Sequence, residues 1–346
     1  MKLTVSAVRA AMRDPFTAGH GTVSERELLL VGLEAIDGEV GYGEAAPLAS
    51  YDGVSLADVR AALEDCRPVL ESYPDATPIA DVLARCSEAT VLPQALAAVD
   101  LALWDLAGRR THEPVWRLLG ARDAVPVEVN WTIASADRSG AAHEAAQARA
   151  GGFQTVKVKV AIGDDAGRLA AVRAFGGPQM TIRIDANGAW GPAEAAATLK
   201  VLRPVGIELC EEPVAGVAAI RALRPHVEVP LALDESAGDP DALHSPAADL
   251  MCLKISRCGG IAGTVEMAAR ARAAGYDVYL ASTLDGPLGI AAALHAAAVL
   301  RPDRACGLAT LGLFAERENP LPVAAGTMAA PAGAGLGSGL TDWYRR

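Results

Sequence analysis

The feature that most constrains the fold of this 346-residue chain is a regular alternation that begins near Val125. Short apolar stretches alternate there with Ala-rich stretches of helical spacing, which is the pattern of a parallel sheet built from β-α units. Eight such units close most naturally into an α/β fold of the (β/α)₈ TIM-barrel type, and a doubly wound open sheet is the less favoured alternative. The expected strands are Val127–Ile133, Thr155–Val160, Thr181–Ala186, Gly206–Cys210, Pro230–Leu233, Leu250–Ile255, Asp277–Ala281 and Ala305–Leu308.

The segment before this alternation has a different character. Residues 1 to about 50 contain apolar runs and the turn signal Asp37-Gly38, which predict a short β-sheet, and helical spacing follows from Ser55 to Leu119. We therefore expect an α+β capping domain over residues 1–120 and the barrel over residues 121–319. The tail, residues 320–346, is rich in Gly, Ala and Pro, so we expect it to complete the capping domain without adding a strand.

Charge and hydropathy exclude several partners. The net charge is −11 and the chain has no basic block, so we expect no nucleic acid. No apolar run reaches the roughly 18 residues of a membrane span, and the N-terminus is too polar for a signal peptide, which predicts a cytoplasmic protein without a membrane partner. The six cysteines form no CxxC pair, which argues for reduced, mostly buried thiols and against a zinc site. A homo-oligomer is compatible with the sequence, which does not give the oligomeric state.

Two lysines stand at the end of the second expected barrel strand. Lys157 and Lys159 are two residues apart, so strand geometry points both side chains to the same face. In a barrel that face is the interior, whereas on an edge strand it is the solvent. The motif alone leaves both readings open.

Carboxylates follow the next three expected strands. Asp185 precedes Asn187, the adjacent pair Glu211-Glu212 ends the fourth strand, and Asp234 follows the fifth. A single acid in such a place is usually a helix N-cap, but three after consecutive strands indicate oxygen ligands of Mg²⁺. The sixth strand then ends at Lys254, about opposite the first lysine pair.

This set of residues suits the removal of a proton next to a substrate carboxylate. A bound metal ion stabilises the enediolate that forms, and a lysine then serves as the base. A lysine is a base only when neutral, so its usual pKa of about 10.4 must be lowered by nearby cations. We expect Lys157 to assist Lys159 in this way, and Lys254 to act from the opposite face of the substrate.

The chain resembles the muconate-lactonizing subgroup of the enolase superfamily over nearly its whole length. The resemblance implies that Asp185, Glu211 and Asp234 bind Mg²⁺, and that Lys159 and Lys254 are the acid/base pair acting on a small-molecule carboxylate. The choice of Glu211 over Glu212 rests on the family pattern alone. The matching motifs are Gly41–Glu44, Ala97–Gly108, Lys157-x-Lys159, Asp185-x-Asn187, Glu211-Glu212-Pro213, Asp234-Glu235-Ser236, and Lys254 with Gly259-Gly260.

Segments late in the chain are similar to those of o-succinylbenzoate synthases. They are Ser282–Ile290, which contains Asp285, and Gly307–Leu313. Asp285 and Asn187 are expected to support the site. The resemblance implies a hydro-lyase that dehydrates 2-succinyl-6-hydroxy-2,4-cyclohexadiene-1-carboxylate in menaquinone biosynthesis.

Other functions stay open beside this one. The same residues suit an N-acylamino acid racemase or another member of the subgroup, such as a cycloisomerase. Dipeptide epimerases carry an Asp-x-Asp motif after the eighth strand, and Gly307–Leu313 lacks it. A further alternative is a catalytically inactive barrel that serves as a binding scaffold, against which the complete set of lysines and carboxylates argues.

Overall fold

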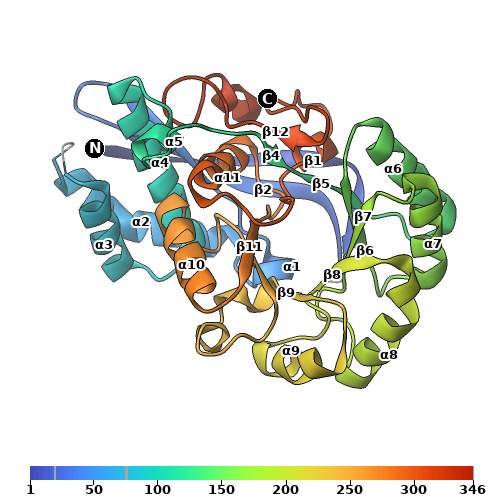
Figure 1. Cartoon of the computed structure of the whole chain (residues 1–346). Coiled ribbons are helices and arrows are strands. Elements are labelled where there is room, and N and C mark those ends of the chain that lie inside the picture. Colours follow the sequence, from blue (N-terminus) through green and yellow to red (C-terminus); the bar gives the residue numbers. More distant parts are fainter. Residues whose placement is uncertain (19–20, 75–76, 346) are drawn as a thin grey trace.

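The computed structural model describes residues 1–18, 21–74 and 77–345, and it begins with a three-stranded antiparallel sheet (Figure 1). The strands β1 (Lys2–Ala18), β2 (Gly21–Glu34) and β3 (Val40–Ala45) lie in that order. The turn between β2 and β3 contains Gly38 at φ +83°, a left-handed conformation that glycine adopts without steric cost. The expected N-terminal sheet and its Asp37-Gly38 turn are therefore confirmed.

Helices cover one face of this sheet and form a hydrophobic core with it. The first long helix starts at a capping box, in which the side chains of Ser55 and Asp58 each bond the backbone N–H of the other. The helices of this part are α1 (Ala49–Asp52), α2 (Leu56–Ser72), α3 (Ile79–Ala89), α4 (Pro93–Thr111) and α5 (Val115–Leu118).

Helix α4 joins the N-terminal part to the barrel. It is buried along most of its length because it packs against β3 on one side and the barrel helix α10 (Ile261–Ala273) on the other. Gly43 of β3 permits the close approach, since a Cβ at this position would overlap the carbonyl oxygen of Ala98. Helix α4 is thus one of the elements that position the capping sheet on the barrel, beside the direct contact of β3 with α11 (Pro287–Leu300).

Seven parallel strands form the barrel sheet, and they lie side by side in chain order. The helices between them cover the outside of the sheet, as the green to orange ribbons of Figure 1 show. The expected α/β barrel is confirmed. Its strands are β5 (Asn130–Ile133), β6 (Thr155–Lys159), β7 (Thr181–Asp185), β8 (Ile207–Glu211), β9 (Leu231–Leu233), β10 (Leu250–Leu253) and β11 (Asp277–Leu280). Its helices are α6 (Arg138–Ala150), α7 (Asp165–Gly176), α8 (Pro192–Leu202), α9 (Val217–Leu223), α10 and α11 (Pro287–Leu300).

The eighth barrel strand, expected over Ala305–Leu308, is reduced to two bridging residues. Cys306 forms a parallel bridge with Val129 beside β5, and Gly307 forms one with Ala281 beside β11. Backbone hydrogen bonds of 2.7 to 3.1 Å hold the two residues on both sides. The ring therefore closes through isolated bridges rather than through a full strand.

The C-terminal tail packs on the capping part, but the expectation that it adds no strand was wrong. Its residues Thr327–Met328 form β12, which pairs antiparallel with β4 (Val127–Glu128), a short strand just ahead of β5 that lies outside the barrel sheet. Beyond β12, the backbone N–H of Leu336 donates to Asp105 of α4 at 2.8 Å. The chain end thus lies on the N-terminal part of the molecule.

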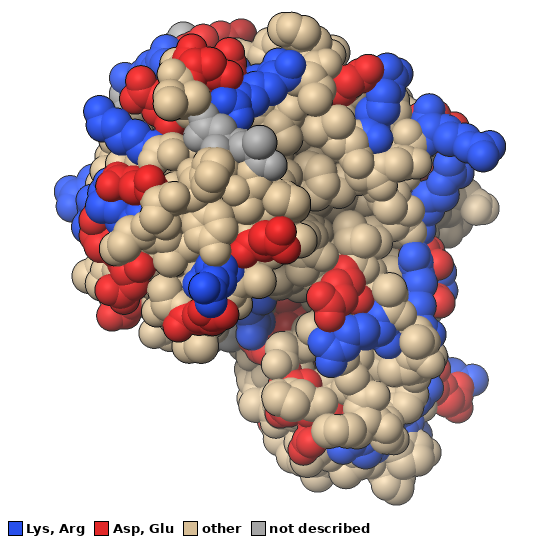
Figure 2. All heavy atoms as spheres, turned by 90° about the vertical axis from the view of Figure 1, so that its left-hand side faces the viewer, with Lys and Arg blue, Asp and Glu red and all other residues tan. Residues whose placement is uncertain are grey.

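The surface carries charges of both signs. Figure 2 shows Lys and Arg side chains interspersed with Asp and Glu side chains over the face that it presents. Among the helices of the described residues, none is both long and apolar enough to cross a membrane.

Candidate active site

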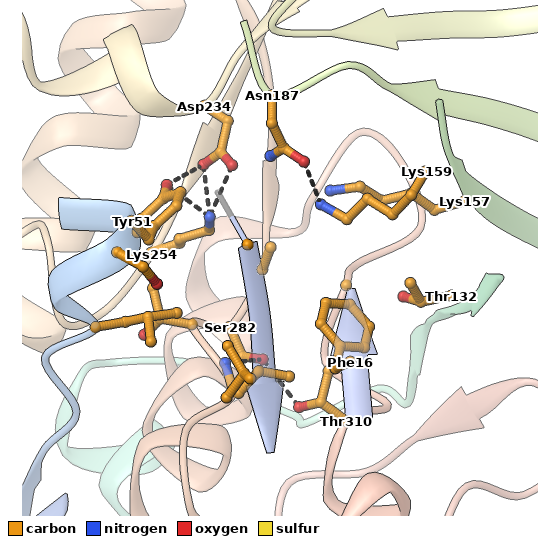
Figure 3. Close-up of a pocket in the computed structure, with 18 residues that line it drawn as sticks. Phe16, Tyr51, Thr132, Lys157, Lys159, Asn187, Asp234, Lys254, Ser282 and Thr310 are labelled. Atoms are coloured by element: carbon orange, nitrogen blue, oxygen red, sulfur yellow. Dashed lines mark hydrogen bonds and ion pairs between the residues drawn. The ribbon is translucent and has the colours of Figure 1, made fainter. Parts of the chain in front are cut away.

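A pocket lies where the carboxyl ends of the barrel strands face the capping part (Figure 3). In barrel enzymes, the active site is built at this end of the strands. The capping part contributes Phe16, Gly21, Val23, Leu48, Ser50 and Tyr51. The barrel contributes Thr132, Lys157, Lys159, Asn187, Asp234, Lys254, Ala281, Ser282, Thr283, Leu284, Gly307 and Thr310.

The two lysines of β6 point into the barrel. Strand β6 has hydrogen-bonded neighbours on both sides, so the edge-strand reading of the Lys-x-Lys motif is wrong. The side chains of Lys157 and Lys159 are only 12% and 10% exposed. The alternating residues Val156 and Val158 are fully buried and belong to the hydrophobic core. The ammonium groups of Lys157 and Lys159 therefore both lie at the pocket.

Three carboxylates lie next to these lysines, at the ends of adjacent strands. Asp185 and Glu211 are the last residues of β7 and β8 and are direct partners across them, and Asp234 follows β9. The ammonium of Lys157 lies 2.8 Å from Oδ2 of Asp185 and 2.5 Å from Oε1 of Glu211. The two carboxylates thus converge on one positively charged group. Carboxylate oxygens are the ligands that Mg²⁺ prefers, so this donor set fits Mg²⁺.

Burial and charge set the protonation of this cluster. Burial alone would lower the pKa of Lys157, but Asp185 and Glu211 raise it well above its usual value. Burial would likewise raise the pKa of Asp185, yet the two neighbouring ammonium groups hold it well below its usual range. Burial raises the pKa of Glu211 to about 7 against the opposing effect of Lys157. Lys157 is therefore a fixed positive charge next to Lys159.

The adjacent residue Glu212 has different partners. It adopts a left-handed conformation, φ +39°, and its carboxylate accepts hydrogen bonds from the backbone N–H of Asp234 at 2.8 Å and from the hydroxyl of Ser236. Burial raises the pKa of Glu212 to about 8. Glu212 thus holds the loop after β9 that carries Asp234, whereas Glu211 faces the lysines.

Lys254, which follows β10, meets a capping residue that the sequence did not reveal. Its Nζ donates to Oδ2 of Asp234 and to the hydroxyl of Tyr51, both at 2.7 Å, and it lies 4.0 Å from the centroid of the Tyr51 ring. The Tyr51 hydroxyl in turn donates to Oδ1 of Asp234 at 2.7 Å. Arg257 donates to the same hydroxyl at 3.1 Å. No local motif marks Tyr51, because only the tertiary structure brings it to Lys254.

The two supporting residues expected from the sequence lie in different places. Asn187 lines the pocket, and its Oδ1 accepts a hydrogen bond from Nζ of Lys159 at 3.0 Å. Asp285 lies behind the pocket wall, where it accepts hydrogen bonds from the hydroxyl and the backbone N–H of Thr283. Burial raises the pKa of Asp285, with Arg26 as an opposing charge. Asn187 therefore contacts the proposed base, while Asp285 supports the loop after β11.

Two further side chains inside the barrel surround Glu211. The hydroxyl of Tyr279 donates to Oε2 of Glu211 at 2.7 Å. Ligand atoms of Glu211, Asp234 and Cys252 all lie within 4.8 Å of one another. Cys252 lies on β10, two residues before Lys254, which directly follows the strand. Strand alternation therefore points both side chains to one face, and this signal could have identified Cys252.

The arrangement is suited to proton transfer at carbon. Figure 3 shows Lys159 and Lys254 on opposite sides of the pocket, with Asn187 and Asp234 between them. A carboxylic acid derivative held between the two amines could lose a proton to one of them and receive charge stabilisation from the other.

Family models match both parts of the chain. Residues 1–120 match the model described as "Mandelate racemase / muconate lactonizing enzyme, N-terminal domain". Residues 140–343 match the model described as "Enolase C-terminal domain-like".

Three curated relatives show where the sequence similarity lies. N-succinyl-L-Arg/Lys racemase of Bacillus cereus is 30% identical over 316 residues, which are 86% of this chain and 84% of the relative. L-Ala-D/L-Glu epimerase of Bacillus subtilis is 29% identical over 316 residues, 87% of this chain and 85% of the relative. The o-succinylbenzoate synthase of Mycobacterium tuberculosis is 42% identical over 206 residues, 56% of this chain and 60% of the relative.

Two solved structures with folds similar to this chain contain bound ligands. A dipeptide epimerase from Cytophaga hutchinsonii, complexed with Mg and the dipeptide D-Ala-L-Val, superposes with a TM-score of 0.90 at 26% identity over 100% of this chain and 98% of that chain. A muconate lactonizing enzyme from Pseudomonas fluorescens, complexed with muconolactone, gives a TM-score of 0.91 at 26% identity and the same coverage.

Proposed function

Because the chain belongs to the mandelate racemase and muconate lactonizing enzyme family of the enolase superfamily, we propose that it is an o-succinylbenzoate synthase. The proposed reaction is the Mg²⁺-dependent dehydration of 2-succinyl-6-hydroxy-2,4-cyclohexadiene-1-carboxylate in menaquinone biosynthesis. The roles assigned below to single residues are part of this proposal.

The observation that carries the proposal is the level of identity to o-succinylbenzoate synthases. It reaches 42% over 206 residues, compared with 30% over 316 residues for the racemase. The shorter match therefore has the higher density of identical residues. The motifs Ser282–Ile290 and Gly307–Leu313 point in the same direction.

The residues that line the pocket favour a substrate that has no ammonium group. Gly307 and Thr310 line it beside the bridge that closes the barrel. Asp234 is the one carboxylate among the described residues that line the pocket, and it is paired with Lys254. A dipeptide ammonium would lack a separate acidic partner, whereas the hydroxylated ring acid needs none.

The catalytic steps follow from the positions of the lysines. Nζ of Lys159, the proposed base, takes the proton from C1 of the ring, and the C–H electron pair enters the ring. The hydroxyl at C6 leaves with the proton that Lys159 returns, so the products are water and the aromatic acid. Asn187 holds Nζ of Lys159 in place, and the ammonium of Lys254 stabilises the negative charge that develops on the other side. Mg²⁺, held by Asp185, Glu211 and Asp234, would neutralise charge on the substrate carboxylate.

A product assay tests the proposal. The full chain is incubated with the ring substrate and Mg²⁺, with a chelator-treated sample as the control. We expect conversion to o-succinylbenzoate that is lost with the chelator and in Lys159→Ala. No conversion in the presence of Mg²⁺ would reject the assigned reaction, and full activity of Lys159→Ala would reject the assigned base.

The second candidate is an N-acylamino acid racemase. The relative that matches 86% of the chain is a racemase of this kind, and lysines on both sides of the pocket suit proton exchange from two faces. Incubation of N-succinyl amino acids in D₂O separates the candidates, because racemisation replaces the α-hydrogen with deuterium. Magnesium binding without either reaction would favour an inactive scaffold.

A further inference from the structure

Cys252 is a buried thiol at the edge between the hydrophobic core and the carboxylates of Glu211 and Asp234, and it lacks a hydrogen-bond partner within the part of the chain that the structure describes. It is 2% exposed. Other buried thiols differ, since those of Cys66 and Cys210 donate to backbone carbonyl oxygens. Buried polar atoms usually have a partner, so an unpartnered one beside carboxylates needs an explanation.

The thiol is directed at two carboxylates. Cys252 of β10 and Lys254, which directly follows this strand, are two residues apart, so strand alternation directs both side chains into the barrel. Sγ of Cys252 and carboxylate oxygens of Glu211 and Asp234 all lie within 4.8 Å of one another. Asp185 is not a member of this group, and its Oδ2 lies 2.6 Å from Nζ of Lys159 and 2.8 Å from Nζ of Lys157.

We infer that Glu211, Asp234 and Cys252 form a site for thiophilic divalent cations of the Zn²⁺ and Co²⁺ class. Mg²⁺ takes oxygen ligands, whereas sulfur favours softer transition metals, so one sulfur among two oxygens changes which ion is preferred. When such an ion binds, a sulfur–metal bond forms and the thiol proton leaves to the solvent. No change in oxidation state is involved.

The two metal sites exclude each other. Glu211 and Asp234 belong both to this donor set and to the proposed magnesium set, so a softer ion displaces Mg²⁺ and leaves Asp185 with the lysines. The donor set itself is independent of the substrate. Only the competition rests on the proposed function, through its magnesium site.

A cobalt titration tests the inference. Chelator-treated full-length protein is titrated with Co²⁺, and the sulfur-to-cobalt charge-transfer band in the near ultraviolet is recorded. We expect the band in the wild type and in Cys258→Ser, a control that removes the half-buried thiol of the following loop. In Cys252→Ser we expect no band and at least about tenfold weaker binding of Co²⁺, since even changes around a ligand weaken metal affinity that much. A band that persists in Cys252→Ser, or its absence from the wild type, overturns the inference.

A second measurement needs no variant. X-ray absorption at the zinc edge of the wild type with one equivalent of Zn²⁺ distinguishes a sulfur ligand, at about 2.3 Å, from ligands that are all nitrogen or oxygen. We expect one sulfur in the first coordination sphere. Oxygen ligands alone would overturn the inference, even if Cys252→Ser fails to fold.

Magnesium competition separates the inference from the proposed function. We expect excess Mg²⁺ to weaken the apparent affinity for Co²⁺ in the wild type. A cobalt–sulfur band together with a negative product assay would leave this site in place and reject the assigned reaction. A positive product assay without the band would support the assigned reaction and reject the cysteine-containing metal site.

Discussion

The hydroxyl of Tyr51 lies 2.7 Å from Nζ of Lys254, although 203 positions separate the two residues in the sequence. The same hydroxyl donates to Asp234, a proposed metal ligand. One side chain of the capping part thus contacts both the proton-transfer machinery and the proposed metal site. The capping part is therefore a component of the candidate active site as well as its cover.

Replacing Tyr51 with Phe tests this contact. The ring over Lys254 is kept, but the hydrogen bonds to Lys254 and Asp234 are lost. Since hydrogen bonds to charged groups contribute about 1.5–3 kcal/mol, we expect kcat to fall roughly tenfold or more. Steady-state assays of the dehydration give kcat and KM. Tyr73→Phe, which removes a hydroxyl bonded to Arg85 away from the pocket, is the control. Equal kcat values in both variants would show that the Tyr51 hydroxyl has no catalytic effect.

Replacing Lys157 with Met tests the shared cation between Asp185 and Glu211. The variant leaves the buried carboxylate of Glu211 without its ammonium partner and Asp185 with Lys159 alone, and breaking a buried pair in this way typically costs about 3–5 kcal/mol of unfolding free energy. We expect this loss in urea denaturation with a chelator present, and partial recovery when Mg²⁺ is added. Lys200→Met, at an exposed position of α8, should keep the stability of the wild type. If the unfolding free energy of Lys157→Met did not change when Mg²⁺ is added, the proposed metal site would be contradicted.

The buried carboxyl group of Glu44 predicts a pH-dependent stability. Burial and the neighbouring Asp285 raise the pKa of Glu44 to about 8, against the opposing hydrogen bonds from Tyr344 and Gly286. An unfolded glutamate titrates near about 4.3, so the folded state binds more protons between these two pH values. The contribution of Glu44 is present below about pH 4.3 and is lost as pH rises through about 8.

Glu44→Gln removes this titration. We expect its free energy of unfolding to fall less than that of the wild type between about pH 5 and about pH 9, as measured by urea denaturation. Glu39→Gln, an exposed change in the same β-hairpin, should retain the wild-type profile. If Glu44→Gln loses as much stability as the wild type over this range, the assignment to Glu44 is incorrect.

Gly260 is expected to tolerate no side chain. It lies at φ +106°, and a Cβ there would overlap the carboxylate of Asp100, which caps helix α10 through the N–H of Ile261. Gly216 is a matched control, because it also precedes a helix at positive φ, +91°, but has no atom within 4 Å of its added Cβ. We expect Gly216→Ala to cost about 1–3 kcal/mol from backbone strain alone, and Gly260→Ala to cost about 1–3 kcal/mol more from the overlap. Equal losses of unfolding free energy in urea would show that Asp100 adjusts freely.

The sequence predicted those site residues that lie at regularly spaced strand ends. Strand alternation and the regular spacing of β-α units placed Lys157, Lys159, Asp185, Glu211 and Asp234 at the ends of neighbouring strands, because these features are local. The length of the last strand was not predictable in this way. Cys306 and Gly307 receive their bridges from β5 and β11, so their conformation depends on how the ring closes.

Contacts between distant segments could not be read from local patterns. Tyr51 reaches Lys254 only through the packing of the capping part on the barrel, and the pairing of β12 with β4 depends on the path of the tail. The roles of Glu211 and Glu212 also depend on the fold. The positive φ of Glu212 directs its carboxylate to the loop after β9. Two adjacent glutamates in a sequence do not predict this backbone conformation.

The closure of the barrel through Cys306 and Gly307 has a consequence for substrate tolerance. Short backbone pairings of one residue on each side hold this seam, so it lacks the extended ladder that joins β5 to β6 and β6 to β7. Ser282 and Thr310, whose hydroxyl oxygens lie 2.9 Å apart, belong to the pocket wall beside it. The proposed metal ligands lie at the carboxyl ends of β7, β8 and β9, on the opposite side of the ring. The fold thus separates the weakly paired wall at the seam from the side of the ring that carries the proposed metal ligands, and changes in that wall need not disturb those ligands.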